Sequence, residues 1–238
     1  MLIIFLFSIT FVLAEKTPYE SYLFKRDYYL SSHQSYIAAK QTYLNYETLQ
    51  TKEKFFSSFK LFLISRNELL RSYLFLLLSR GSEFLPEEEL EGVKTWITWL
   101  NDDTQQINKF VSVSELTDAA SYLKVRYPQI EKGIFSFLAE LTIAQQNLIE
   151  EDIRQLINQI SDVDSTASEW LDEVKKQLDL VDQNQELAMS RIKNARIRRI
   201  GDGFRVWQKG QRELSRANEQ LEKASSFLDE IIKKLEQL

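Results

Sequence analysis

Residues 168–195 read SEWLDEVKKQLDLVDQNQELAMSRIKNA, and apolar or small residues return along them at the alternating three- and four-residue spacing of a heptad. Residues 214–238, LSRANEQLEKASSFLDEIIKKLEQL, repeat the pattern. The two sets fall out of register across Gly201-Asp202-Gly203. We therefore expect two helices, 166–200 and 204–238, in an antiparallel coiled-coil-like hairpin. One long helix with a stutter at the glycines is the alternative.

The rest of the chain also has the composition of helices. Its 238 residues include only 6 glycines and 3 prolines, and Gly81 is the first glycine. A β-rich fold needs turn-forming residues roughly every 8–12 positions, and this chain has too few glycines and prolines to supply them. Leucine, glutamate, lysine and glutamine, which favour helices, dominate instead. The composition predicts an all-α protein built as an elongated helical bundle.

A capping signal marks where the first helix begins. Thr17 and Glu20 form a capping box around Pro18, which favours the first helical turn. Neither glycine nor proline follows until Gly81, so we expect one uninterrupted helix from Pro18 to about Arg80.

Two further helices are expected after this one. Pro86, followed by three glutamates, opens the first of them. Ser112 precedes a glutamate by three residues in a second capping box, which begins a helix that runs to about Ile160. Pro128 and Gly133 fall inside that helix and should kink or break it.

The first residues bear on localisation. Leu2 to Ala14 is apolar apart from Ser8 and Thr10, and as a helix it would span roughly 20 Å, short of the ~30 Å hydrocarbon core of a membrane. This length suits the apolar region of a signal peptide, although no lysine or arginine precedes it. We expect residues 1–14 to be a signal peptide of an exported protein, with a buried first helix as the alternative. The remainder divides into a helical bundle, 15–160, and the hairpin region, 161–238.

Residues able to carry chemistry are few. The absence of cysteine excludes disulfides, thiolate zinc sites and a lipidated cysteine. His33 is the single histidine, and it lacks the Glu-x-x-His pairing of di-iron bundles and the partners of a nucleophilic triad. Residues 162–173 place oxygen-bearing side chains at several EF-hand positions, but Ala167 stands where that loop needs glycine. The sequence therefore indicates no enzyme, no cofactor and no metal site.

A row of tyrosines is the first candidate binding feature. The row follows the seven-residue repeat of the first helix and consists of Tyr22, Tyr29, Tyr36 and Tyr43. Tyrosine rings are apolar but their hydroxyls need water or a partner, so they suit the edge of a helical interface. The row is either a seam within the bundle or a stripe on which a partner helix or a second copy docks.

A basic segment is the second candidate. Residues 191–212 carry a net charge of +7, so the remainder of the −5 chain carries −12. Its cations are Arg191, Lys193, Arg196, Arg198, Arg199, Arg205, Lys209 and Arg212. These charges are either neutralised within the protein or form a solvated face, as charge runs usually do, or they bind an anionic lipid or surface polymer. Export argues against nucleic acid as the partner.

These observations favour an exported, non-catalytic scaffold or protein-binding module that engages a protein partner or another copy of itself through helical seams. The alternative is a peripheral surface protein that binds an anionic polymer or membrane through residues 191–212. An enzyme is the third and weakest interpretation, because no catalytic constellation is visible in the sequence.

Residues 1–14 are expected to make no essential packing contacts, because a signal peptide is removed from the mature protein. A chain that begins at Glu15 should keep the helical content and melting temperature of the full chain when both are measured by circular dichroism. A melting temperature lower by several degrees would show that the segment belongs to the bundle.

Overall fold

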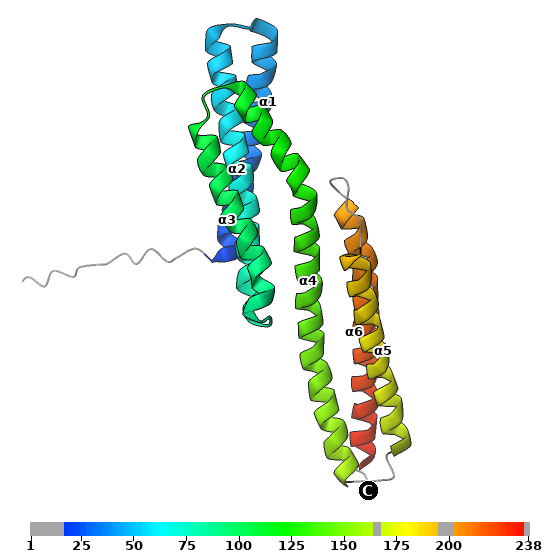
Figure 1. Ribbon diagram of the computed structural model, residues 1–238. Helices are drawn as coiled ribbons and strands as arrows, with labels where there is room; N and C mark the ends of the chain where they lie inside the picture. Colours follow the sequence, from blue (N-terminus) through cyan, green and yellow to red (C-terminus); the bar gives the residue numbers. More distant parts are fainter. Residues whose placement is uncertain (1–16, 164–167, 195–201, 236–238) are drawn as a thin grey trace, which may run out of the picture.

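Six α-helices account for nearly all of the residues that the computed structural model describes, which are 17–163, 168–194 and 202–235 (Figure 1). The helices are α1 (Pro18–Tyr46), α2 (Leu49–Gly81), α3 (Glu87–Lys109), α4 (Val113–Val163), α5 (Ser168–Lys193) and α6 (Asp202–Leu235). No strand occurs in these ranges. The predicted all-α class and elongated form are confirmed.

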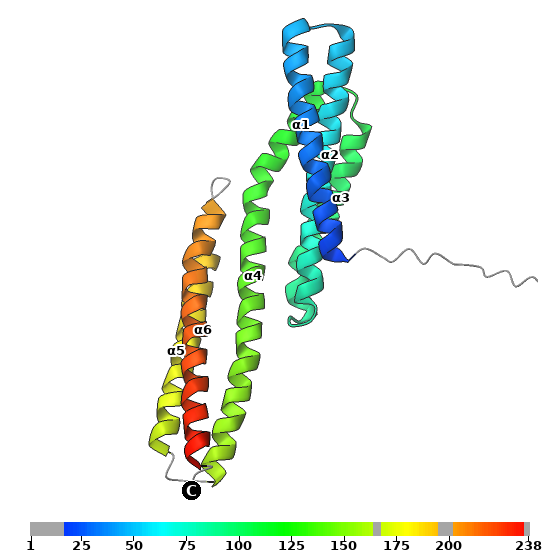
Figure 2. The same cartoon turned by 180° about the vertical axis from the view of Figure 1, so that it is seen from behind.

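The long helix α4 connects two packed bodies. Its first half lies with α1, α2 and α3, and its second half lies beside the pair α5–α6 (Figures 1 and 2). Ile130, Ile134 and Phe137 pack in one apolar core with residues of α2 and α3. Ile153 and Ile157 pack in another with residues of α5 and α6. The predicted boundary at residue 160 stays a prediction, and α4 contributes to the cores on both sides.

Helix α4 bends but does not break where the sequence predicts a kink or a break. Pro128 and Gly133 both lie inside it. Figures 1 and 2 show that the helix bends in its N-terminal third, the part that contains Pro128. Proline removes a backbone donor and crowds the preceding turn, which bends a helix without ending it when the surrounding packing holds.

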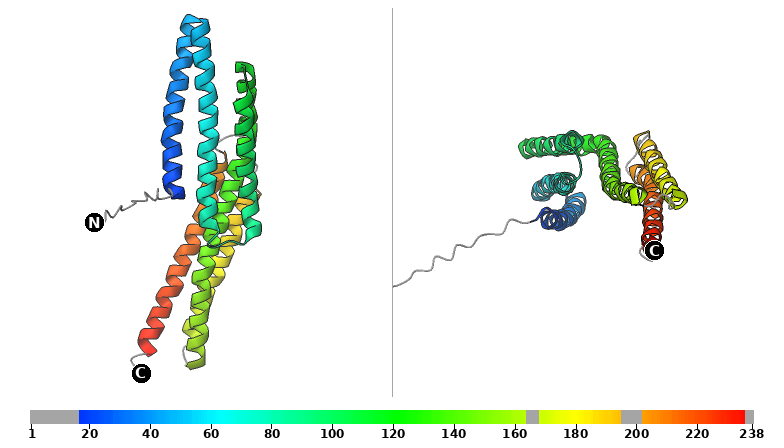
Figure 3. Two further views of the ribbon diagram at one scale, coloured as in Figure 1. Left: turned by 90° about the vertical axis from the view of Figure 1, so that its left-hand side faces the viewer. Right: turned by 90° about the horizontal axis from the view of Figure 1, so that it is seen from below.

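The expected single helix from Pro18 to Arg80 is wrong. The chain turns after Tyr46, and α2 runs back along α1, so that the two helices form an antiparallel hairpin (Figure 3). Glu47 adopts a left-handed conformation with φ of 40°, and its N–H donates to the carbonyl of Tyr43 at 2.8 Å. Thr48 then caps α2, because its hydroxyl accepts from the N–H of Thr51 at 3.2 Å. Reversal occurs here without glycine or proline.

The two capping boxes predicted from sequence are confirmed. The N–H of Glu20 donates to the Thr17 hydroxyl at 3.2 Å, and the N–H of Thr17 donates to the Glu20 carboxylate at 2.9 Å. The same exchange joins Ser112 and Glu115. Donation from the backbone of Val111, with further bonds from Ser112, holds the pKa of Glu115 below its usual range.

The C-terminal helical pair is also confirmed, because α5 and α6 pack closely side by side rather than continue as one helix. Close approach depends on Gly210, where an added Cβ would lie 2.5 Å from Cδ1 of Ile192. A buried polar layer joins this pair to α4: the Gln146 amide donates to the carbonyl of Leu214 at 2.9 Å, and the Gln185 amide donates to Gln146 at 3.2 Å. Buried amides of this kind fix the register of packed helices.

The left-handed residue at the α1–α2 turn generates a test of the hairpin. Replacing Glu47 with glycine should raise the free energy of unfolding by about 1 kcal/mol, because glycine adopts this conformation without steric cost. The matched change Glu151→Gly, at an exposed position inside α4, should lower it by about 1 kcal/mol. Chemical denaturation measures both. If Glu47→Gly also destabilises the protein, residue 47 lies in a continuous helix.

Candidate functional site

The tyrosine row of α1 lies against α2. All four rings are half-buried, and each faces an aromatic ring of α2. The ring centroids are 5.7 Å apart for Tyr22 and Tyr73, 5.7 Å for Tyr29 and Phe62, 5.0 Å for Tyr36 and Phe59, and 5.5 Å for Tyr43 and Phe55. The row therefore forms a seam within the chain. Docking of a partner on the exposed edges of these rings stays a prediction.

The residues that follow three of these tyrosines form a separate surface, which we call the outer row. It consists of Leu30, Ile37 and Leu44, whose exposed fractions are 49%, 39% and 60%. Helix α1 packs almost entirely on α2, so no other described helix covers these side chains. Their seven-residue spacing keeps them on one side of α1 over four turns of helix.

The structure divides the basic segment. Arg196, Arg198 and Arg199 lie outside the described residues. Arg191 forms an ion pair with Glu213 at 2.6 Å, and Lys193 forms one with Glu140 at 3.3 Å. Glu213 is only 2% exposed, so its pairing with Arg191 keeps a buried carboxylate compensated.

The remaining described cations of the segment are free. Arg205, Lys209 and Arg212 are exposed on successive turns of one face of α6. Within the described ranges, no carboxylate lies within ion-pair distance of any of them. At the end of α5, the carbonyl of Lys193 accepts a hydrogen bond from Lys132 of α4 at 2.8 Å.

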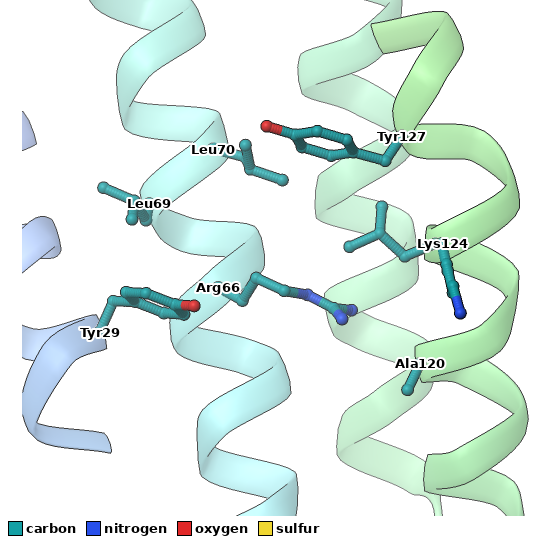
Figure 4. A pocket seen from close by; sticks show the side chains of 8 residues that line it. Tyr29, Arg66, Leu69, Leu70, Ala120, Lys124 and Tyr127 are labelled. Carbon is teal, nitrogen blue, oxygen red and sulfur yellow. The ribbon is translucent and has the colours of Figure 1, made fainter. Parts of the chain in front are cut away.

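A pocket between α1, α2 and α4 is a third candidate, with a volume of about 340 Å³. Figure 4 shows the Arg66 side chain extending from α2 toward α4, with leucines of α2 and the rings of two tyrosines around it. The lining residues are Tyr29, Arg66, Leu69, Leu70, Ala120, Leu123, Lys124 and Tyr127. The walls are thus largely apolar, and the only charged groups among them are cations.

Arg66 is held in an unusual electrostatic environment. Its Nε and Nη2 atoms are buried and have no hydrogen-bond partner among the described residues. Burial lowers the pKa of Arg66 to about 10, and the charge of Asp103 partly opposes this effect. Asp103 already accepts a hydrogen bond from the Asn67 amide at 2.7 Å and forms no ion pair with Arg66. The guanidinium therefore stays charged at neutral pH without a direct counterion.

Sequence reasoning missed this pocket for a physical reason. In the sequence, Arg66 is one of a few charged residues that interrupt the apolar stretch from Phe55 to Leu78. Its burial depends on α4, which contributes residues 120–127 from a distant part of the chain. The one available signal was a cation within a dense apolar segment that no neighbouring acid on the same helix neutralises.

Models of known protein families, curated proteins and solved structures were compared with the chain, and none of them matches it. In the described ranges, histidine, aspartate and glutamate form no group of three or more suited to hold a metal ion. None of the helices in those ranges combines the length and apolar character of a membrane-spanning segment. Function must therefore be inferred from the surfaces and the pocket themselves.

Tyr73, in the seam between α1 and α2, and Tyr127, in the pocket, should lose their protons only at a higher pH than usual for tyrosine. Burial raises the pKa of Tyr73 and of Tyr127 above the usual value of 10.0. A raised pKa means that the folded state holds the proton more tightly, so the resulting stability is complete below pH 10.0 and is lost as the pH rises through the folded value. In an ultraviolet titration of tyrosinate, Tyr73→Phe should remove a late component.

Proposed function

We propose that the protein is an exported, non-catalytic helical scaffold whose outer row docks a helix of a protein partner, a second copy of the chain included. The observation that carries this proposal is the outer row itself: three large apolar side chains, seven residues apart, on a helix that packs almost entirely on one neighbour.

The geometry of the outer row suits a helical partner. Seven residues of α-helix rise about 10.5 Å, so the three side chains form a straight line roughly 21 Å long. A partner helix that carries apolar residues at the same spacing can bury all of them at once. Scattered exposed leucines are normal on protein surfaces, whereas a regular row on an edge helix is the arrangement that interaction sites use.

A site-specific photo-crosslinker tests this docking. Placed at Ile37, it should give one discrete crosslinked product in the producing cell, because that side chain would lie inside the interface. Ser35 is exposed on the opposite side of α1, and a crosslinker there should give no such product. Products that are equal from both positions, or absent from both, would contradict the proposal. A product of twice the mass of the chain would identify the partner as a second copy.

A second function is favoured by the free cations of α6. Arg205, Lys209 and Arg212 share one helix face and have no compensating carboxylate in the described part of the chain. Each cation near an anionic membrane contributes about 1 kcal/mol at modest salt. This face supports binding to an anionic lipid surface or polymer, the peripheral role that the basic segment predicts.

Replacing these three residues with glutamine should weaken binding to vesicles that contain phosphatidylglycerol, without a change in helical content. Binding of the unaltered protein should itself decrease as salt is raised, because added ions screen the attraction. Arg26, Lys52 and Lys54 are exposed in the other body and give a matched triple replacement, which should leave vesicle binding unchanged. Unaltered protein that fails to sediment with the vesicles at low salt would exclude this role.

A further inference from the structure

We propose that the pocket between α1, α2 and α4 binds a small amphipathic carboxylate, whose charged head pairs with Arg66 and whose apolar body lies against the leucines of α2 and α4. This inference concerns a small ligand and does not depend on the docking of a protein partner at the outer row.

The nature of the head group follows from the two nitrogens of Arg66 that have no hydrogen-bond partner in the described part of the chain. Nε and Nη2 lie on the same edge of the guanidinium and carry two parallel N–H groups. A carboxylate matches this edge with two oxygens, and the resulting charge-assisted pair is stronger than a neutral hydrogen bond. Lys124 lines the same pocket and adds a second positive charge, whereas none of the lining residues is acidic. The electrostatics therefore select an anion.

The apolar body follows from the remaining walls. Leu69, Leu70 and Leu123 present aliphatic surface, and the rings of Tyr29 from α1 and Tyr127 from α4 complete the walls (Figure 4). A volume of about 340 Å³ is at the lower end of the range of roughly 300–1,000 Å³ that small-molecule sites occupy. It is too small for a polymer segment and large enough for a short acyl or aryl chain.

Access to Arg66 needs a movement of a lining side chain, since Nε and Nη2 are closed to solvent. Lys124 is exposed and carries a long flexible stem, so it can turn toward a bound anion at little cost. Binding then compensates a buried charge that has no ion pair among residues 17–163, 168–194 and 202–235. The ligand should thus stabilise the folded state in proportion to its affinity.

Isothermal titration of the full chain with octanoate, octanol and inorganic phosphate tests the inference. Octanoate should bind, octanol should bind at least tenfold more weakly because it lacks the charge, and phosphate should bind at least tenfold more weakly because it lacks the apolar body. No binding of octanoate at ~10 mM, or equal binding of octanol or phosphate, would overturn the proposed ligand class.

Two variants distinguish a loss of octanoate binding at Arg66 from a general loss of stability. Arg66→Met keeps the length of the side chain, removes the charge, and should weaken octanoate binding at least tenfold while the melting temperature stays equal or rises. Arg71→Met is the matched control: Arg71 lies on the same helix, donates to Asn101 at 2.7 Å and does not line the pocket. It should leave octanoate binding within about twofold. Unchanged binding by Arg66→Met, or an equal loss in both variants, would refute the role of Arg66.

Ala120→Phe offers a second measurement that keeps Arg66 in place. The larger side chain should fill the pocket and abolish octanoate binding. If this variant unfolds, the smaller change Ala120→Val decides the matter, since it should reduce affinity at unchanged helical content. Full octanoate affinity in a folded Ala120 variant would show that the ligand binds elsewhere.

Discussion

The packing of α4 against two different helical groups is the constraint on which the rest of the structure depends. Neither the α1–α2 hairpin nor the α5–α6 pair encloses a core alone, because each consists of only two helices. Helix α4 completes both cores, through Ile130 and Phe137 on one side and Ile153 and Ile157 on the other. The helices pack tightly at Gly81, where an added Cβ would lie closer to the Phe137 ring than van der Waals contact allows.

The regular parts of the fold could be predicted because their causes are local in sequence. Hydroxyl and carboxylate groups three residues apart predicted the starts of α1 and α4, and the heptads predicted the packing of α5 on α6. The α1–α2 turn was not predicted because neither glycine nor proline, the usual residues of a reversal, occurs at or near Glu47. Thr48 and Thr51 could have revealed it, since two threonines can exchange the hydrogen bonds of a capping box.

The candidate sites depend more strongly on tertiary structure, so less of them could be predicted. Spacing identified the tyrosine row, but only the position of α2 shows that the rings face inward and that Leu30, Ile37 and Leu44 remain outside. Charge counting identified the basic segment, but only the packing of α6 shows that Arg191 neutralises the buried Glu213. The Arg66 pocket is lined by residues of three helices, α1, α2 and α4, and no local sequence pattern predicts that these helices come together.

The short link between α1 and α2 has a consequence for how copies of the chain can exchange parts. Its reversal depends on the backbone of one non-glycine residue, Glu47, which occupies a conformation that costs about 1–2 kcal/mol. If residues 46–49 became helical, α1 and α2 would join into one straight rod, and the aromatic face of α2 at Phe55, Phe59 and Phe62 would lose its cover. Two such rods side by side would restore the same ring contacts between chains, with α1 of each copy covering α2 of the other. Such an exchange would leave the ring contacts almost unchanged while it released the strain at Glu47.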